Sequence, residues 1–291
     1  MANLKEVRNR ITSVSSTQQI TSAMKMVSAA KLRKAQDAVT AMRPYAGKLK
    51  SILENLSASI SDGKYSQQRE VKNVLLVVIT SNRGLCGGFN ANVIKAAGRL
   101  AREEYKGANV TILAIGKKGG DFFKKGNFAN ITGDMTKNPN ELFDHLTFAN
   151  VAPVAEKVME MFAAEKFDKV ELIYNMFKNA AVQITTVEQF LPVMPPEVTS
   201  IKKHSVDFIY EPNQDEIVKT IVPLSLKTQL FKALRDSLAS EHGARMTAMH
   251  KATDNAGALI KDLKLMYNKA RQAAITNEIL EIVGGAEALN G

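Results

Sequence analysis

The sequence contains no tryptophan, and aromatic residues make up only 6% of its 291 positions. Its single cysteine, Cys86, excludes an internal disulfide and a thiolate metal cluster within one chain, and it favours a reducing, intracellular setting. Long apolar runs are also missing. The longest in the central part, residues 74–79, is far shorter than the roughly 20 residues of a membrane span. The N-terminus shows no signal-peptide pattern, so we expect any association with a membrane to be peripheral.

What remains is an ordinary globular composition, with 45% hydrophobic and 23% charged residues. The formal net charge of +10 is unevenly distributed. Residues 1–50 hold ten Lys or Arg against Glu6 and Asp37, whereas residues 241–291 hold six basic and six acidic residues. The positive field therefore belongs mainly to the N-terminal part, where it would attract nucleic acid, anionic lipid or an acidic protein surface.

Residues 1–60 are predicted to form one long helix. Its apolar residues step by three and four, as in a coiled coil: Leu4, Val7, Ile11 and Val14, then Met24 and Val27. The repeat loosens between these groups, at Gln18 and Thr21. Pro44 predicts a bend or a local break.

Residues 213–291 show a cleaner repeat of the same kind. The positions predicted to face a partner helix are Met249, Ala252, Ala256, Leu259, Leu263, Met266, Ala270 and Ala273. Pro212 and Pro223 bound a short segment before this repeat, and Pro223 suits the first turn of the helix. Neither terminal helix can bury its apolar stripe alone, so we expect the two to pair as an antiparallel coiled coil.

Residues 61–212 are predicted to form an α/β domain. Strands are expected at residues 71–80, 109–115, 169–176 and 181–190, and helices at residues 90–105 and 140–166. Alternation of strands and helices favours a Rossmann-like, partly parallel sheet, and the short connection between the last two strands suggests one antiparallel edge. The predicted fold is thus α/β, with this domain inserted between the two helices of a long antiparallel coiled coil.

The glycine-rich loop at residues 80–90 is the most plausible site for chemistry. A glycine loop between a strand and a helix is where nucleotide-binding folds hold phosphate. However, neither G-x-G-x-x-G nor G-x-x-x-x-G-K-[ST] is present, and the second strand ends in Ile115-Gly-Lys-Lys without an acid to hold a ribose. A tight structural turn explains the loop better, and a nucleotide-binding enzyme remains the main alternative.

Other candidate sites have weaker support. Cys86 has no His or acid nearby in sequence to activate it as a nucleophile. The four histidines show no metal-binding spacing: His145, His204, His242 and His250. The basic residues of the N-terminal helix would suit a nucleic-acid adaptor, yet Tyr45 is the only aromatic residue near them. We therefore expect no cofactor, no metal and no nucleic acid.

The C-terminal end is unusual for an exposed helix. Its apolar residues cover most of the circumference: Ile275, Ile279, Leu280, Ile282, Val283 and Leu289. A helix that is apolar all round is normally buried, and the N-terminal helix is too short to cover this one. We infer that another protein surrounds it, and we call Ile275, Ile279, Leu280, Ile282 and Val283 the apolar tip.

Several segments together resemble one family, the gamma subunits of F-type ATP synthases. Its C-terminal signature is similar to Ile275-Thr-x-Glu-x-x-Glu281-x-x-x-Gly285-Ala286, and its N-terminal one to residues 20–32. The other similar segments are Arg43-Pro-Tyr45, residues 81–90, Arg245-Met246 and Ala252-Thr-Asp-Asn255. The resemblance extends over essentially the whole chain, in order.

This resemblance implies a central rotor, with the coiled coil inside a ring of three alpha and three beta subunits. The α/β domain would contact the epsilon subunit and the c-ring of the membrane sector, and the catalytic sites would lie in beta. The positions that match residues coupling rotation to catalysis are Met24, Lys25, Arg245, Arg271, Gln272, Thr276 and Glu278. The N-terminus lacks a transit peptide, so we expect a bacterial enzyme, peripheral on the cytoplasmic face of the inner membrane.

Overall fold

The computed structural model describes residues 4–55, 63–126, 128–135, 138–194 and 214–290. Its two longest helices are α1 (Leu4–Asn55) and α6 (Gln214–Asn290). The chain divides into two compact units, residues 1–28 with 246–291 and residues 29–245. Both helices contribute to both units. In the described ranges, no helix is both long and apolar enough to cross a membrane.

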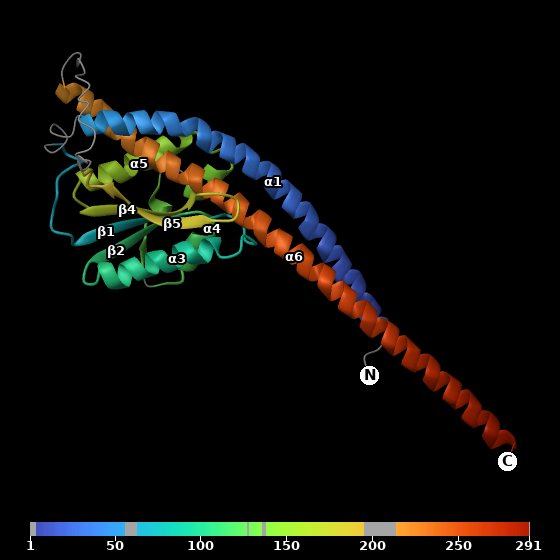
Figure 1. Cartoon of the computed structure of the whole chain (residues 1–291). Helices are drawn as coiled ribbons and strands as arrows, with labels where there is room; N and C mark the ends of the chain where they lie inside the picture. Colours follow the sequence, from blue (N-terminus) through green and yellow to red (C-terminus); the bar gives the residue numbers. More distant parts are fainter. Residues whose placement is uncertain (1–3, 56–62, 127, 136–137, 195–213, 291) are drawn as a thin grey trace. The chain divides into compact units, whose positions relative to one another are not determined.

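The larger unit contains a five-stranded sheet in the order β3-β2-β1-β4-β5 (Figure 1). Its strands are β1 (Asn73–Ile79), β2 (Asn109–Ile115), β3 (Ala129–Asn130), β4 (Lys169–Phe177) and β5 (Gln183–Leu191). All neighbours pair in parallel except β4 and β5, which form the expected antiparallel edge. The order matches that of a Rossmann-like sheet, so the predicted fold class is confirmed. The two-residue strand β3 was not predicted.

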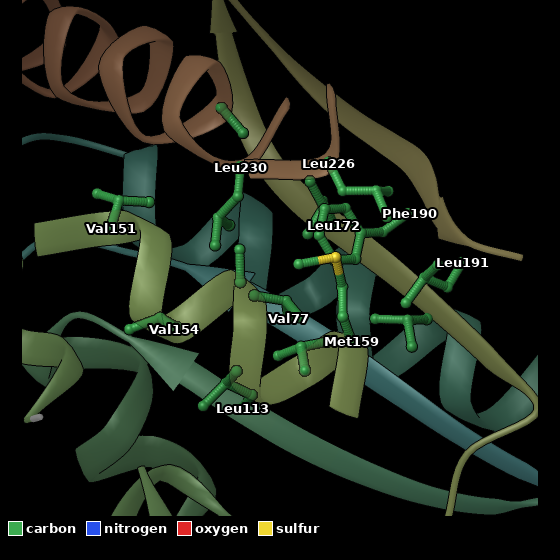
Figure 2. Close-up of a cluster of buried hydrophobic side chains, with 14 of the residues drawn as sticks. Val77, Leu113, Val151, Val154, Met159, Leu172, Phe190, Leu191, Leu226 and Leu230 are labelled. Carbon is green, nitrogen blue, oxygen red and sulfur yellow. The ribbon is translucent and has the colours of Figure 1, made fainter. Parts of the chain in front are cut away.

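Helices cover both faces of the sheet. Every residue of β1 after Asn73 is therefore buried. Val74, Leu76 and Val78 face α3 (Phe89–Arg99), which continues into a π-helical turn at Leu100–Glu104. The alternate residues of β1 face α5 (Phe148–Ala163) and α6. Figure 2 shows this second core, where Val77 and Leu172 pack against Met159 of α5 and Leu226 and Leu230 of α6.

The single helix predicted at residues 140–166 is wrong. A 3-10 helix at Pro139–Phe143 comes first, and α5 begins only at Phe148. Thr147 has extended backbone angles, φ −116° and ψ 155°, which separate the two helices. Leu142 and Leu146 are nevertheless buried in the same core as α5. Their apolar spacing therefore looks like a continuous helix in the sequence. A short helix α4 (Lys117–Phe123) was not predicted at all.

The interpretation of Pro223 needs correction, and the local break that was one of the two expectations for Pro44 is absent. Pro223 lies inside α6 rather than in its first turn, and α1 continues without a break through Pro44. Proline removes only one hydrogen bond of a helix. Around Pro223 this loss is offset by the buried side chains of Val218, Val222 and Leu226. Pro212 and the predicted domain boundaries at 60/61 and 212/213 lie outside the described residues.

The smaller unit is an antiparallel pair of helices, as predicted. Arg8 Nη2 donates to the Tyr267 hydroxyl at 2.7 Å, and Thr253 Oγ1 donates to Thr21 Oγ1 at 2.9 Å. Residue numbers therefore rise along α1 as they fall along α6. Val7, Thr21 and Ser28 are buried on α1, whereas Val27, which was predicted to face the partner, is exposed.

Five of the eight predicted core positions of α6 are buried or half-buried, namely Met249, Ala252, Ala256, Leu263 and Ala270. Met249, Ala256 and Leu263 are buried, but Leu259 and Met266 are 39% and 53% exposed. At Leu259, Met266 and Ala273, the residue that faces α1 is instead the next one in the sequence, which is half-buried. One regular repeat of buried or half-buried residues is Met249, Thr253, Ala256, Ile260, Leu263, Tyr267, Ala270 and Ala274. The steps are thus four then three, and two polar side chains, Thr253 and Tyr267, occupy core positions.

Candidate functional site

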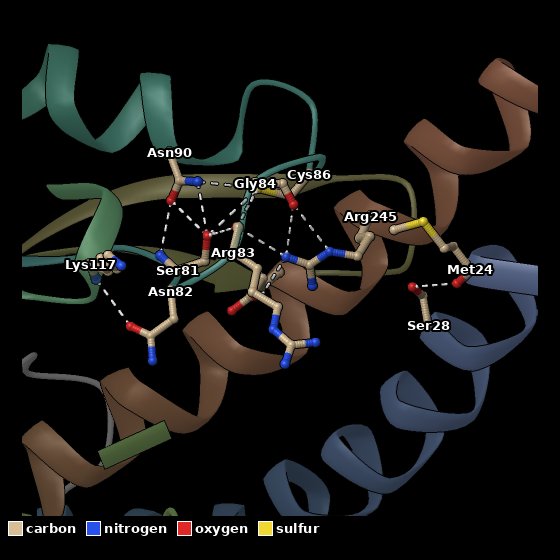
Figure 3. A network of polar contacts seen from close by, with 11 residues as sticks. Met24, Ser28, Ser81, Asn82, Arg83, Gly84, Cys86, Asn90, Lys117 and Arg245 are labelled. Atoms are coloured by element: carbon tan, nitrogen blue, oxygen red, sulfur yellow. Dashed lines mark hydrogen bonds and ion pairs between the residues drawn. The ribbon is translucent and has the colours of Figure 1, made fainter. Parts of the chain in front are cut away.

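The glycine-rich loop after β1 is held by its own side chains (Figure 3). The backbone N–H of Ser81 donates to Asn90 Oδ1 at 2.9 Å, and Ser81 Oγ donates to the Arg83 carbonyl at 2.6 Å. Leu85 and Gly87 adopt positive φ angles of 62° and 57°. A left-handed leucine is strained by about 1 kcal/mol or more. The loop is therefore a tight turn fixed by specific hydrogen bonds.

Cys86 is a structural residue of this loop. Its side chain is buried against Phe89 and Ala244, and Asn90 Nδ2 lies 3.3 Å from its sulfur. Burial raises the pKa of the thiol, which keeps it protonated and unreactive. The geometry thus agrees with the sequence, which offers no activating group for a nucleophile.

Arg245 of α6 joins the loop to the helix. Its guanidinium donates to the carbonyls of Arg83 and Gly84, in each case from Nη2 at 3.2 Å. It also forms an ion pair with Glu241 Oε1 at 2.7 Å. Burial raises the pKa of the Glu241 carboxyl, and the positive charge of Arg245 opposes that rise. We refer to Arg83, Gly84, Glu241 and Arg245 as the Arg245 network.

This network favours a structural role for the loop over a nucleotide site. In doubly wound sheets, ligands bind at the carboxyl ends of the strands where the strand order reverses, which here is between β1 and β4. Two contacts bring α6 to the loops that follow these two strands. Arg245 binds the loop after β1, and Gly243 is so close to the hairpin after β4 that an added Cβ would lie 3.0 Å from the Ala180 carbonyl oxygen. The structural interpretation of the loop is therefore favoured.

The histidines that the structure describes form no metal-binding cluster. Among the described residues, no three His, Cys, Asp or Glu side chains are placed to hold a metal ion. His204 lies outside the described residues. His250 is exposed and lies 3.4 Å from Asp254. His242 is half-buried, and burial together with the charges of Arg245 and Lys31 lowers its pKa to about 4.

The buried neutral state of His242 predicts loss of stability in acid. Because the pKa is lower in the folded state than in the unfolded state, protonation favours unfolding as the pH falls from about 6.5 to about 4. The free energy of unfolding should therefore fall between pH 7 and pH 4.5. We expect the fall to be about 2 kcal/mol smaller in His242→Gln than in the wild type. Urea unfolding of the purified chain at pH 7 and pH 4.5 measures it. The exposed His250→Gln is the control, and equal acid sensitivity of wild type and His242→Gln would contradict the assignment.

The residues expected to couple rotation to catalysis fall into three places. Met24 and Lys25 are half-buried on α1. Arg271, Gln272, Thr276 and Glu278 are exposed on two successive turns of α6, where Thr276 Oγ1 donates to the Gln272 carbonyl at 2.9 Å. Arg245 differs from all of these, because only 8% of it is exposed and its Nε and Nη2 atoms donate inside the larger unit.

The apolar tip is exposed along its whole length. The exposed fractions of its five side chains lie between 48% (Ile275) and 71% (Ile282). The register set by Arg8 and Tyr267 places Leu4, the first described residue of α1, opposite about Arg271. The tip therefore extends beyond that end of α1 along a helix that continues to Asn290. The Leu289 side chain is outside the described residues.

Glu241 and Asn90 were not singled out in the sequence, although both help to fix the loop. The spacing of Glu241 and Arg245, i and i+4 on a helix, is a signal for an ion pair. Nothing in the sequence indicates that this pair is buried against a loop more than 150 residues earlier.

Comparison with known proteins gives a consistent result. A family model described as ATP synthase matches residues 3–289. The ATP synthase gamma chain of Flavobacterium johnsoniae is 63% identical over 294 residues, covering 100% of both chains. A chain in the Tetrahymena thermophila mitochondrial ATP synthase central stalk and c-ring structure is 27% identical, with a TM-score of 0.59 over 80% of this chain and 99% of that one. A chain of the Euglena gracilis mitochondrial ATP synthase has a similar fold, with a TM-score of 0.67 at 22% identity, over 98% of this chain and 94% of that one.

Proposed function

We propose that this chain, which belongs to the ATP synthase gamma-chain family, is the central rotor of an F-type proton-translocating ATP synthase. It transmits rotation of the c-ring to catalytic sites in the beta subunits and is not catalytic itself. The observation that carries this proposal is the exposed apolar tip. Such a surface needs a protein around it, and few directional contacts are needed there, so the tip is free to turn.

The partners follow from the same proposal. Three alpha and three beta subunits surround the coiled coil, and the α/β domain contacts epsilon and the c-ring. Structures of related complexes support this arrangement, because similar chains occur in a central stalk with a c-ring and in an assembly of OSCP, F1 and a c-ring. We further propose residues 1–60, 61–212 and 213–291 as the N-terminal helix, α/β domain and C-terminal helix. The complex would lie peripherally on the cytoplasmic face of a bacterial inner membrane.

The energy that must be transmitted requires many contacts. To change one catalytic site from 1:99 to 99:1 in favour of a closed state, the rotor must supply about 5.5 kcal/mol of differential interaction. An exposed ion pair contributes about 0–1 kcal/mol. No single exposed residue such as Arg271 can therefore account for coupling, and the exposed polar residues of α6 must share it with the tip.

Reconstitution tests the proposed function. The partner subunits are assembled in vesicles with and without this chain, and ATP hydrolysis and proton transport are measured together. We expect proton transport only when the chain is present, and no ATP hydrolysis by the chain alone. Coupled transport without the chain, or turnover by the pure chain, would contradict the proposal.

Arg271 and Gln272 are the exposed polar pair expected to contact a beta subunit. We expect Arg271→Ala with Gln272→Ala to lower the number of protons transported per ATP by more than either change alone, because both side chains would contact one loop. Circular dichroism should be unchanged, since both residues are exposed. The neighbouring exposed Lys269→Ala serves as the control. Wild-type coupling in the double variant would exclude both residues from force transmission.

A further inference from the structure

Helix α6 contacts the α/β domain in two different ways within the larger unit. The first contact is apolar: Val218, Val222, Leu226 and Leu230 pack into the core beneath the sheet. The second is the Arg245 network, in which one guanidinium holds two carbonyls and one carboxylate. Both contacts lie on one helix. The first resists separation of α6 from the sheet, and the second resists rotation of α6 about its own axis.

Apolar burial stabilises contact without fixing direction, because the hydrophobic effect is non-directional. A helix held only by Val222, Leu226 and Leu230 resists separation from the sheet more strongly than rotation about its own axis. Hydrogen bonds depend on donor–acceptor angle and weaken steeply when misaligned. The guanidinium of Arg245 has a rigid planar arrangement of donors, so its bonds to the Arg83 and Gly84 carbonyls are lost when α6 turns relative to the loop.

We infer that the Arg245 network fixes the rotational position of α6 against the α/β domain, and that Arg245 is a positioning residue for energy transmission rather than a contact to the surrounding subunits. The inference rests on the proposed function. It explains why Arg245, unlike Arg271, is almost completely buried. In a rotor driven through its α/β domain, torque enters α6 through this network as well as through the apolar face.

Two neighbouring contacts strengthen the assignment. Ala244 packs with Cys86 and Phe89 of the loop, and Gly243 closely approaches the Ala180 carbonyl of the β4–β5 hairpin. Three consecutive residues of α6 therefore lie against the segments that follow two different strands, β1 and β4. A glycine at 243 permits this approach, and the arginine at 245 then meets the loop carbonyls.

The test uses the reconstituted complex and the double variant Glu241→Gln with Arg245→Gln. Removing both charges avoids leaving one buried and unpaired, which would endanger folding. We expect ATP hydrolysis to stay within about twofold of wild type, while protons transported per ATP fall by about twofold or more, as loss of directional hydrogen bonds permits slippage. The matched control is Lys261→Gln, an exposed position on α6, which should leave both rates unchanged.

A covalent link provides the second measurement. Ala244→Cys, added to the double variant, places a second thiol in the same buried cluster as Cys86. Oxidation with diamide at alkaline pH, which ionises thiols that are protonated at neutral pH, joins loop and helix before the assay. We expect oxidation to restore protons transported per ATP, and reduction with dithiothreitol to remove the gain. A purely structural role for the network would not produce this reversible change in coupling.

The outcomes separate this inference from the proposed function. Normal coupling in the double variant, or an oxidised link that restores nothing, overturns the role of Arg245. Loss of the chain from the complex, with transport and hydrolysis falling together, also overturns it, because the network would then serve assembly alone. Failure of the wild-type complex to couple transport to hydrolysis would instead contradict the rotor proposal.

Discussion

Gly116→Ala is expected to destabilise the α/β domain by roughly 3–5 kcal/mol. Gly116 follows β2 with φ of 109°, a conformation that side-chain-bearing residues rarely adopt, and a Cβ there would lie 2.1 Å from the Thr80 carbonyl oxygen. Neither atom can move freely, because the Thr80 N–H donates to the Ile115 carbonyl at 2.8 Å between two buried strands. Backbone strain and a backbone clash therefore add.

Urea unfolding of the purified chain, followed by circular dichroism, measures this effect. Gly120→Ala is the matched control, since it lies only four residues later in α4 and an added Cβ would meet nothing within 4 Å. We expect that change to be neutral or to stabilise the chain by up to about 1 kcal/mol, from helix propensity. If Gly116→Ala unfolds at the wild-type urea concentration, the close approach of β1 and β2 at this turn is wrong.

The sheet was largely predictable because its signals are local. The run of residues 74–79 gave β1, and residues 109–115 match β2 without error. The break at residues 144–147 was not predictable, because Leu142 and Leu146 keep apolar spacing while Thr147 leaves the helix. Strand β3 has only two residues, and it pairs only with β2. Such a strand leaves no periodic signal in the sequence.

The coiled coil shows where periodicity alone fails. The repeat gave Met249, Ala256 and Leu263, one residue in every seven, as core positions. Between these residues, the next core position is either three or four residues further along α6. Which one faces α1 depends on how α6 is turned relative to α1. Sequence hydrophobicity favoured Leu259 and Met266, but the structure uses Ile260 and Tyr267. The hydroxyl of Tyr267 has a partner in Arg8, and this pairing across the helices is not visible in either helix alone.

The candidate site was predicted only in part. Positions expected to couple rotation to catalysis, such as Arg271, follow from the family resemblance, and the apolar tip follows from the spacing of apolar residues around the helix. The Arg245 network required the structure, because Glu241 and Arg245 contact a loop far away in sequence. Long-range contacts of polar side chains carry no local pattern. The resemblance indicated that Arg245 matters, but not that it acts from inside the larger unit.

Ile279→Ser with Ile282→Ser in the apolar tip is expected to weaken association with the alpha and beta subunits by at least about 100-fold. Full burial of an isoleucine side chain contributes roughly 1.5–3 kcal/mol, and each factor of ten in affinity corresponds to about 1.4 kcal/mol. Both side chains are more than half exposed in the chain by itself, so their replacement should not alter its own stability. The whole effect should therefore appear in binding, measured by titrating labelled chain with the assembled alpha and beta subunits.

Glu281→Ala, on the same exposed turn, separates apolar burial from electrostatic attraction. If apolar surfaces of the alpha and beta subunits surround the tip, removing this charge should change the affinity by less than about threefold, since an exposed ion pair contributes about 0–1 kcal/mol. The loss of affinity caused by the serine substitutions should depend little on salt, because hydrophobic contacts are not screened. An unchanged affinity of Ile279→Ser with Ile282→Ser would mean that the tip stays in solvent within the complex. The rotor proposal would then lose the observation that carries it.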